Sequence, residues 1–289
     1  MSIAGKRRLA AAGFVALLAL SVFWPAPVLT INDLCCRAAL PIDATSFLGR
    51  EAPSWDVVFW CIAGLFTIAV LQSFDFAWRD FGDAWRRLRD FRVRVPRPAA
   101  LGIAAAVASA LVLVTWRHLD APITAWAERV DSARIEAVMS IFNRLGGGIN
   151  PALVVLFFVV AGVVSAYPSW TRLGVAMGLA GLAAGITAQV IKVAVARVRP
   201  ELWLGPFVRA THGATSFPSG HTIGSFALAG VLLFGSRSLP LRVVAILLAC
   251  AVALARVFAF RHWGSDVLAS ALMGLFAAWL AERGMAEEP

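Results

Sequence analysis

The sequence predicts an all-α fold, a polytopic transmembrane helical bundle. Of its 289 residues, 60% are hydrophobic and only 15% are charged, whereas soluble domains carry about 25% charged residues. Apolar runs near the length that a spanning helix needs, about 20 residues, recur along the chain. Tryptophans stand near the ends of several runs, at Trp24, Trp55, Trp116 and Trp170, where an interfacial aromatic belt would place them. Because lipid cannot satisfy exposed backbone polar groups, the spanning segments are expected to be helices.

Eight apolar stretches are predicted to cross the membrane: Leu9–Ile31, Pro53–Phe74, Pro98–Trp116, Pro151–Ala166, Leu173–Val195, Thr222–Phe234, Leu241–Phe260 and Ser265–Leu280. The first follows a basic start but has no small-residue cleavage motif, so we expect a retained helix. The stretches divide the chain into residues 1–97, a two-helix membrane module with a basic linker, and residues 98–289, a six-helix core. Three roles stay open for the first two helices: bracing the core, forming a homodimer interface, or shaping access from the bilayer.

The distribution of basic residues predicts the orientation in the membrane. Arginines crowd the linker before the third stretch, at Arg79, Arg86, Arg87, Arg89, Arg92, Arg94 and Arg97. The positive-inside rule places such a linker in the cytoplasm. Both termini are then cytoplasmic, and loops 32–52, 117–150, 196–221 and 261–264 face the outer, periplasmic side of the cell (inner) membrane.

The overall charge and the cysteines exclude other classes of protein. A net charge of +9 would favour nucleic-acid binding in a soluble protein. Here the basic residues flank apolar runs, which indicates contact with anionic lipid instead, so we expect no nucleic-acid partner. The four cysteines form no CxxC motif and no carboxylate cluster suits Mg²⁺, so we expect neither a metal nor a cofactor. Cys250 lies inside an apolar run and is expected to be buried.

Six basic residues break the topology rule because they lie in or beside outer loops: Lys192, Arg197, Arg199, Arg209, Arg256 and Arg261. Ionisable side chains at such depths are costly to place and are usually functional. We interpret Arg197, Arg209 and Arg261 as interfacial side chains whose charged ends reach water. The other three are candidates for binding an anion.

The segment Ile123–Leu145 is predicted to be an amphipathic helix on the outer surface rather than a span. Its apolar residues Ile135, Val138, Met139 and Phe142 recur at helical spacing, with charged residues between them. The three glycines that follow are expected to end this helix before the next span.

The first motif, Lys192 to Arg199 and Pro200, leaves the outer end of the fifth stretch. Seven residues, about two helical turns, separate the two cations, so both can face one direction. Pro200 disfavours helix at Arg199 and bends the chain there. Two fixed cations facing one pocket suit a phosphate dianion, to which arginine can donate two hydrogen bonds.

The second motif, Pro218-Ser219-Gly220-His221, directly precedes an apolar stretch. Free backbone N–H groups at a helix N-terminus form an anion site. Gly220 lets the backbone approach an anion closely, and Ser219 adds a hydroxyl donor. His221 lies at the rim of that site, where it can donate a proton.

The third motif contains Arg256, His262 and Asp266. His262 and Asp266 are four residues apart and share a face if they are helical. A carboxylate on the Nδ1–H group would fix the tautomer and leave Nε2 free to attack. Arg256 adds a third cation from the end of the preceding helix.

Taken in this order, the three motifs resemble the type 2 phosphatidic acid phosphatase superfamily. That family's pattern is Lys-x6-Arg-Pro, then Pro-Ser-Gly-His, then Ser-Arg-x5-His-x3-Asp, and the resemblance covers roughly residues 98–283. The chain departs from it at Ala255, where the family usually has Ser, a change that could loosen Arg256. The resemblance implies a catalytic set of His262 as nucleophile, His221 as acid and base, and Asp266 as orienting group. It implies phosphate binding by Lys192, Arg199, Ser219, Gly220 and Arg256.

The activity implied by the resemblance is metal-independent hydrolysis of a membrane lipid phosphate through a phosphohistidine intermediate. Candidate substrates are undecaprenyl pyrophosphate, phosphatidylglycerol phosphate, phosphatidate and a lipid A phosphate. Two alternatives stay open: a lipid phosphotransferase that uses the same site, and a non-catalytic membrane scaffold. The superfamily also includes soluble vanadium haloperoxidases, but the eight apolar stretches argue against that branch.

Overall fold

The computed structural model describes residues 86, 88, 89, 91, 98–147, 150–165, 168–202, 204–209 and 215–285. The first two predicted spans therefore lie outside the described residues. The chain forms two compact units, one of residues 1–86 and 147–174 and the other of residues 87–146 and 175–289. Every site residue discussed below lies in the second unit. The predicted boundary between residues 97 and 98 stays a prediction.

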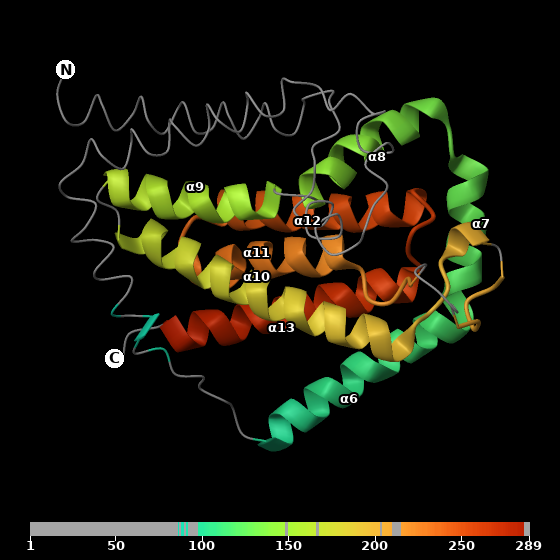
Figure 1. The fold of residues 1–289 in the computed structure, drawn as a ribbon, viewed down its shortest axis with the longest axis horizontal. Coiled ribbons are helices and arrows are strands. Elements are labelled where there is room, and N and C mark those ends of the chain that lie inside the picture. The colour runs from blue at the N-terminus through green and yellow to red at the C-terminus, as the bar shows by residue number, and fades with distance from the viewer. Residues whose placement is uncertain are drawn as a thin grey trace, which may run out of the picture. The chain divides into compact units, whose positions relative to one another are not determined.

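The described residues are almost entirely helical, which confirms the all-α class. In chain order the main helices are α6 (Pro98–Val114), α7 (Asp120–Val130), α8 (Ala133–Gly146), α9 (Asn150–Ser165), α10 (Pro168–Val195), α11 (Gly220–Gly235), α12 (Leu239–Phe258) and α13 (Gly264–Met285) (Figure 1). Within these residues the extended pairing is limited to two isolated bridges, Arg197 with Arg209 and Val198 with Thr215.

Four of the described helical segments are long and apolar enough to cross a membrane: Pro98–Val130, Ser169–Val195, Leu239–Phe258 and Gly264–Met285. They make the chain a multi-pass membrane protein. Helices α9 and α11 each have 16 residues, about 24 Å of helix, which is shorter than a hydrocarbon core of about 30 Å.

The third predicted span does not end at Trp116. The helix continues from α6 through a π-helical turn, Thr115–Leu119, directly into α7. The single surface helix predicted over Ile123–Leu145 is therefore wrong, because its first turns belong to this long helix. The chain breaks at Asp131 and Ser132 before α8 begins. A π-helical turn changes which side chains face inward, and such turns are frequent at functional sites.

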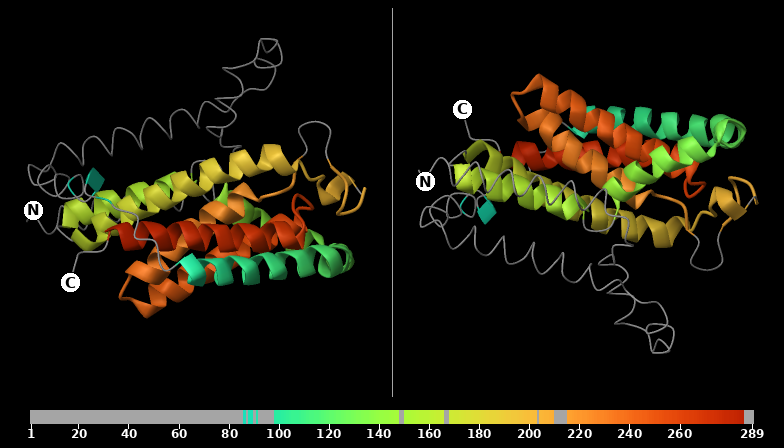
Figure 2. Two further views of the ribbon diagram at one scale, coloured as in Figure 1. Left: turned by 90° about the horizontal axis from the view of Figure 1, so that it is seen from below. Right: turned by 90° about the horizontal axis from the view of Figure 1, so that it is seen from above.

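Helices α11 and α13 pack closely through small residues. An added Cβ at Gly274 would collide with the backbone of Ile223 and Ala227, and one at Gly230 would collide with Ala278. Next to this contact, Phe226, Ala229 and Ala249 form an apolar cluster that joins α11 to α12. Helix α6 lies along the other side of α13 (Figure 2). This packing holds the N-terminus of α11 beside that of α13.

Two left-handed residues turn the chain at the ends of helices. Ala196 follows the last residue of α10 with a φ of 47°, and Phe260 follows α12 with a φ of 51°. A side chain disfavours this conformation, so it persists where the surroundings hold it. The two residues immediately precede Arg197 and Arg261, where the chain enters the site.

Candidate active site

Three connecting segments converge at one end of the second unit (Figure 1). The backbone N–H of Ser216 donates to the carbonyl of Arg197 at 2.6 Å, and that of Glu201 donates to Phe260 at 3.0 Å. The Ser216 Oγ also lies 3.4 Å from the carbonyl oxygen of Arg261. The three motifs predicted to act together are thus joined by their own backbones.

His262 is buried, with 3% of its surface exposed. Its Nδ1 lies 2.6 Å from the carbonyl oxygen of Ser216. A carbonyl oxygen can only accept, so Nδ1 must carry the hydrogen. In a neutral imidazole the hydrogen on Nδ1 leaves Nε2 with a free lone pair. The ring therefore has the tautomer that a nucleophilic Nε2 requires.

The surroundings also favour the neutral ring. Burial lowers the pKa of His262 well below its usual value, and the charges of Arg256, Lys192 and His221 lower it further, although the hydrogen bond to Ser216 opposes them. A lowered pKa means that the neutral form persists at neutral pH and below it. His262 is thus a neutral imidazole near the cations Arg256 and Lys192.

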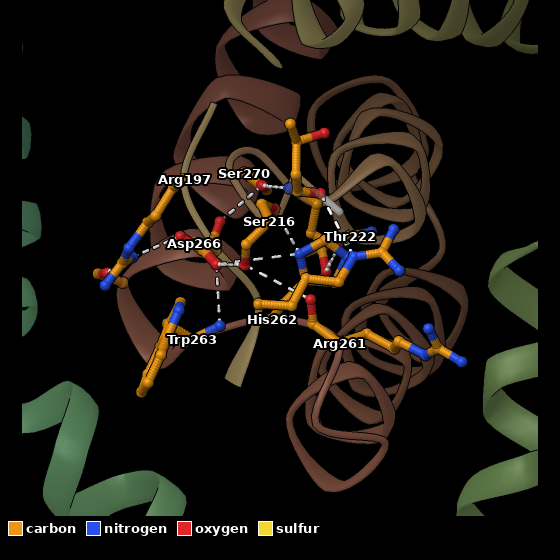
Figure 3. Close-up of polar contacts among 12 residues, drawn as sticks. Arg197, Ser216, Thr222, Arg261, His262, Trp263, Asp266 and Ser270 are labelled. Atoms are coloured by element: carbon orange, nitrogen blue, oxygen red, sulfur yellow. Dashed lines mark hydrogen bonds and ion pairs between the residues drawn. The ribbon is translucent and has the colours of Figure 1, made fainter. Parts of the chain in front are cut away.

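Asp266 does not make the direct hydrogen bond that its spacing predicted. Its Oδ2 lies 3.9 Å from Nδ1 of His262. Instead Oδ2 accepts hydrogen bonds from the Ser216 hydroxyl and, at 2.9 Å, from the Trp263 backbone N–H. Figure 3 shows Ser216 between Asp266 and His262. Asp266 therefore fixes the imidazole through Ser216, whose side chain it holds while the Ser216 carbonyl holds the ring.

Arg197 is not an interfacial side chain, and that prediction is wrong. Only 6% of the residue is exposed. Its guanidinium pairs with Asp120 through Nη2 and with Asp266 through Nη1, both at 2.5 Å. Its Nε donates to the carbonyl of Pro206 at 2.9 Å, and its guanidinium lies over the Trp263 ring at 5.3 Å. Arg197 is a buried structural cation on the far side of Asp266 from His262 (Figure 3).

Asp120 links this cluster to the long helix. It is the first residue after the π-helical turn and is fully buried. Its Oδ1 accepts from the Ser265 backbone N–H at 2.7 Å, and its Oδ2 accepts from the Ser265 hydroxyl at 2.6 Å. Because Ser265 lies in the first turn of α13, Asp120 both caps that turn and neutralises Arg197.

The three predicted phosphate-binding cations do gather. Lys192 lies near the end of α10, and the positive charges of Arg199 and Arg256 act on it. Arg199 donates to the carbonyl of Thr215 and to the Glu201 carboxylate, each at 3.4 Å. The same carboxylate pairs with Arg261 at 2.9 Å. Arg261 has 46% of its side chain exposed, and its interfacial position stays a prediction.

Arg256 is 8% exposed. Its Nη1 donates to Oδ1 of Asn143 on α8. In the part of the chain that the structure describes, its buried Nε has no hydrogen-bond partner. Arg256 thus has a donor that no described residue uses, and its charge acts on Lys192 and His262.

Ser219 is the N-cap of α11 and is fully buried. Its Oγ accepts from the Thr222 hydroxyl at 3.0 Å and from the Thr222 backbone N–H at 3.4 Å, and its own N–H donates to Ser270 at 2.8 Å. In both contacts with Thr222 the Ser219 Oγ accepts, so its own proton is not used in them. Gly220 and His221 form the first turn of α11, where backbone N–H groups lack partners within the helix.

Residues 169–288 match the family model of the PAP2 superfamily. The chain is 32% identical over 114 residues to a lipid A 1-phosphatase from Porphyromonas gingivalis, an alignment that covers 39% of this chain and 24% of that relative. The chain thus spans about a quarter of the length of this curated relative.

Two solved structures were also found to be similar. One is a transmembrane PAP2-type phosphatidylglycerolphosphate phosphatase from Bacillus subtilis, with 23% identity and a TM-score of 0.49 over 62% of this chain and 94% of that one. The other is LpxE from Aquifex aeolicus, with 20% identity and a TM-score of 0.47 over 57% of this chain and 95% of that one.

Proposed function

We propose that the protein is an integral membrane lipid phosphatase, a proposal supported by the match of residues 169–288 to the family model of the PAP2 superfamily. The observation that carries the proposal is the tautomer of His262. Its Nδ1 is held by the Ser216 carbonyl, so the nucleophilic lone pair is on Nε2. Lys192 and Arg256 lie close enough for their charges to act on this ring.

In the first step Nε2 of His262 attacks phosphorus in line with the bond to the lipid oxygen. The N–P bond forms as the P–O bond breaks, and a proton from His221 passes to the departing oxygen. Burial and the charges of Arg256 and Lys192 lower the pKa of His221 to about 3, so His221 takes up that proton together with the bound phosphate, whose negative charge opposes those of the cations. Lys192, Arg199 and Arg256 stabilise the charge that develops on the equatorial oxygens. Asp266 keeps the imidazole oriented through Ser216.

In the second step water hydrolyses the phosphohistidine. His221, which has lost its proton to the lipid alcohol, takes one from water as the oxygen attacks phosphorus. The N–P bond breaks, inorganic phosphate leaves, and both histidines return to their starting protonation states. The same residues serve both steps, so no further group is needed.

The N-terminus of α11 supplies the remaining phosphate contacts. The first backbone N–H groups of a helix form an anion site, and here they belong to Gly220 and His221. A Cβ added at Gly220 would meet no heavy atom within 4 Å, so packing does not require this glycine. Close approach of a phosphate to the backbone accounts for it, with the Ser219 hydroxyl as a further donor.

The substrate we propose is a lipid that carries a phosphate or pyrophosphate at the outer face of the cell (inner) membrane. Exposed apolar side chains lie on the loop beside the site, among them Leu202, Leu204 and Phe207. These residues suit contact with lipid, so an amphiphile can present its headgroup to the cations. Undecaprenyl pyrophosphate, phosphatidylglycerol phosphate, phosphatidate and a lipid A phosphate meet this description.

A panel of these four lipid classes tests the proposal on protein purified in detergent. We expect phosphate release from at least one lipid, undiminished by EDTA, because the proposed steps use His262, water activated by His221, and fixed cations instead of a metal ion. In the described residues no group of three His, Cys, Asp or Glu side chains is placed to hold a metal. Loss of activity in EDTA that Mg²⁺ or Zn²⁺ restores would contradict metal independence.

The lipid panel also distinguishes a phosphatase from a lipid phosphotransferase and from a non-catalytic membrane scaffold. Transfer of phosphate to an added lipid alcohol, in preference to water, would identify a phosphotransferase. An absence of phosphate release and of transfer with every lipid, in protein that remains folded, would favour a non-catalytic scaffold.

The orientation can be tested by cysteine labelling. Leu204 is exposed on the loop beside the site, and Arg237 is exposed on the turn between α11 and α12. We expect Leu204→Cys to react with a membrane-impermeant thiol reagent in cells without an outer barrier, and Arg237→Cys to react only after permeabilisation. The native cysteines must first be replaced, because Cys250 is exposed on α12 and not buried as expected. The reverse labelling would overturn the assigned orientation.

A further inference from the structure

Two buried arginines lie near the nucleophile, and they are held in different ways. Arg197 is paired with the carboxylates of Asp120 and Asp266, so its charge is neutralised. Arg256 donates instead to the uncharged side-chain amide of Asn143. The difference bears on how much positive charge each arginine can offer to a bound anion.

An amide oxygen holds a guanidinium without neutralising it. A carboxylate at position 143 would form an ion pair with Arg256 and compete with an incoming phosphate. The amide accepts one hydrogen bond and leaves the full charge of the guanidinium available. The buried Nε of Arg256 has no partner among the described residues, so a donor remains for a phosphate oxygen.

The position of Asn143 is fixed by the packing of α8 on α12. Asn143 and Gly146 are three residues apart and share a face of α8, while Val252 and Arg256 are four apart and share a face of α12. An added Cβ at Gly146 would collide with the Val252 side chain. The helices therefore touch one turn away from the hydrogen bond, which limits movement of Asn143 relative to Arg256.

Ala255 makes the hydrogen bond between Arg256 and Asn143 more important for holding the guanidinium. The residue is fully buried directly before Arg256, and its methyl group offers no hydrogen bond. Within the described residues, Asn143 provides the one side-chain hydrogen bond that the guanidinium makes. The site therefore depends on a residue far from the three motifs in sequence.

We propose that Asn143 is a positioning residue for the phosphatase reaction, holding Arg256 in the orientation that stabilises the transferring phosphate. The inference rests on the proposed function. Asn143 acts through Arg256 and does not itself contact the reacting atoms. Its removal should then affect the transition state more than the binding of the lipid.

Asn143→Ala tests the inference, with Ser140→Ala on the same helix as the matched control. We expect kcat on a lipid phosphate to fall between about 10- and 100-fold, since a displacement near 1 Å can cost this much, while KM changes less than about 3-fold. Inhibition by orthovanadate, which mimics the five-coordinate transition state, should weaken by a similar factor. Asn143→Asp should keep the fold but lower kcat/KM at least about 10-fold, because its carboxylate competes for Arg256.

A double variant shows whether Asn143 acts through Arg256. In an Arg256→Lys background, which keeps the charge but not the planar donor geometry, adding Asn143→Ala should cost less than about 3-fold. Equal losses in both backgrounds would overturn the inference, as would a folded Asn143→Ala protein with the kcat of the Ser140→Ala control. An inactive wild-type protein would instead refute the proposed function.

Discussion

Replacement of His262 by alanine is expected to abolish phosphate release, with kcat falling by at least about 10⁴-fold. The reason is that Nε2 forms the bond to phosphorus, and within the described residues no other histidine is buried with its Nδ1 bonded to a backbone carbonyl. The measurement is phosphate release from a lipid phosphate by detergent-purified protein. Trapping with ³²P-labelled lipid adds a direct readout, because a phosphohistidine is stable in alkali and labile in acid.

The matched control is His118→Ala. His118 is exposed in the π-helical turn, so its loss should leave both kcat and labelling unchanged. His221→Ala should lower kcat by about 10²- to 10⁴-fold, the usual contribution of acid and base catalysis. Equal turnover by the His262→Ala and wild-type proteins would exclude His262 as the nucleophile, whatever the substrate.

Replacement of Arg197 by alanine is expected to be the most destabilising change near the site. It would leave Asp120 and Asp266 buried without the cation that both contact at 2.5 Å. Removing one partner of a buried ion pair costs about 3–5 kcal/mol of unfolding free energy. The unfolding temperature in detergent should therefore fall by roughly 10 °C.

Arg209→Ala is the control for that substitution. Arg209 is exposed on the same loop and donates to the carbonyl of Ala194 at 3.1 Å. Its loss should change the unfolding temperature by no more than about 2 °C, as expected for an exposed side chain. Similar shifts for the two variants would mean that the Arg197 pairs contribute nothing beyond a surface contact.

The fold class could be predicted because apolar length and basic flanks are direct consequences of a lipid environment. The ends of the helices were harder to predict. A span ending at Trp116 satisfies the length rule, yet the helix continues to Val130. Hydropathy carries no information on a π-helical turn, whose effect on side-chain direction depends on tertiary contacts.

The chemistry of the site was partly predictable from spacing. The charges of Arg199 and Arg256 act on Lys192, and those of Arg256 and Lys192 act on His262, whereas the catalytic and phosphate-binding roles of these residues stay predictions. The prediction that the Asp266 carboxylate accepts the hydrogen bond from Nδ1 of His262 was wrong. A separation of four residues favours a direct contact only if both residues lie in one helix. His262 precedes α13, which begins at Gly264, so the ring turns toward the Ser216 carbonyl.

The sequence did not predict the supporting roles of four residues at the candidate site: Asn143, Asp120, Arg197 and Ser216. Ser216 acts mainly through its backbone carbonyl, which no side-chain pattern reveals. Arg197 was visible as a charge against the topology rule, but its interpretation depended on finding a counterion. Asp120 lies 77 residues away in sequence, so only the folded chain identifies it. The signal available in the sequence was an acidic residue just beyond the predicted end of a span at Trp116.

The buried ion pair between Asp120 and Arg197 joins a residue outside the segment that matches the family model to a residue inside it. The family resemblance found by comparison covers residues 169–288, whereas Asp120 and Asn143 lie before it. The recognisable part of the chain therefore contains the groups that we propose to react but not Asp120 and Asn143, which hold Arg197 and Arg256. Exchange of that segment between related proteins would transfer a catalytic pattern without its supports. Substitutions in α7 and α8 of this chain can thus release Arg197 or Arg256 while the three motifs stay unchanged.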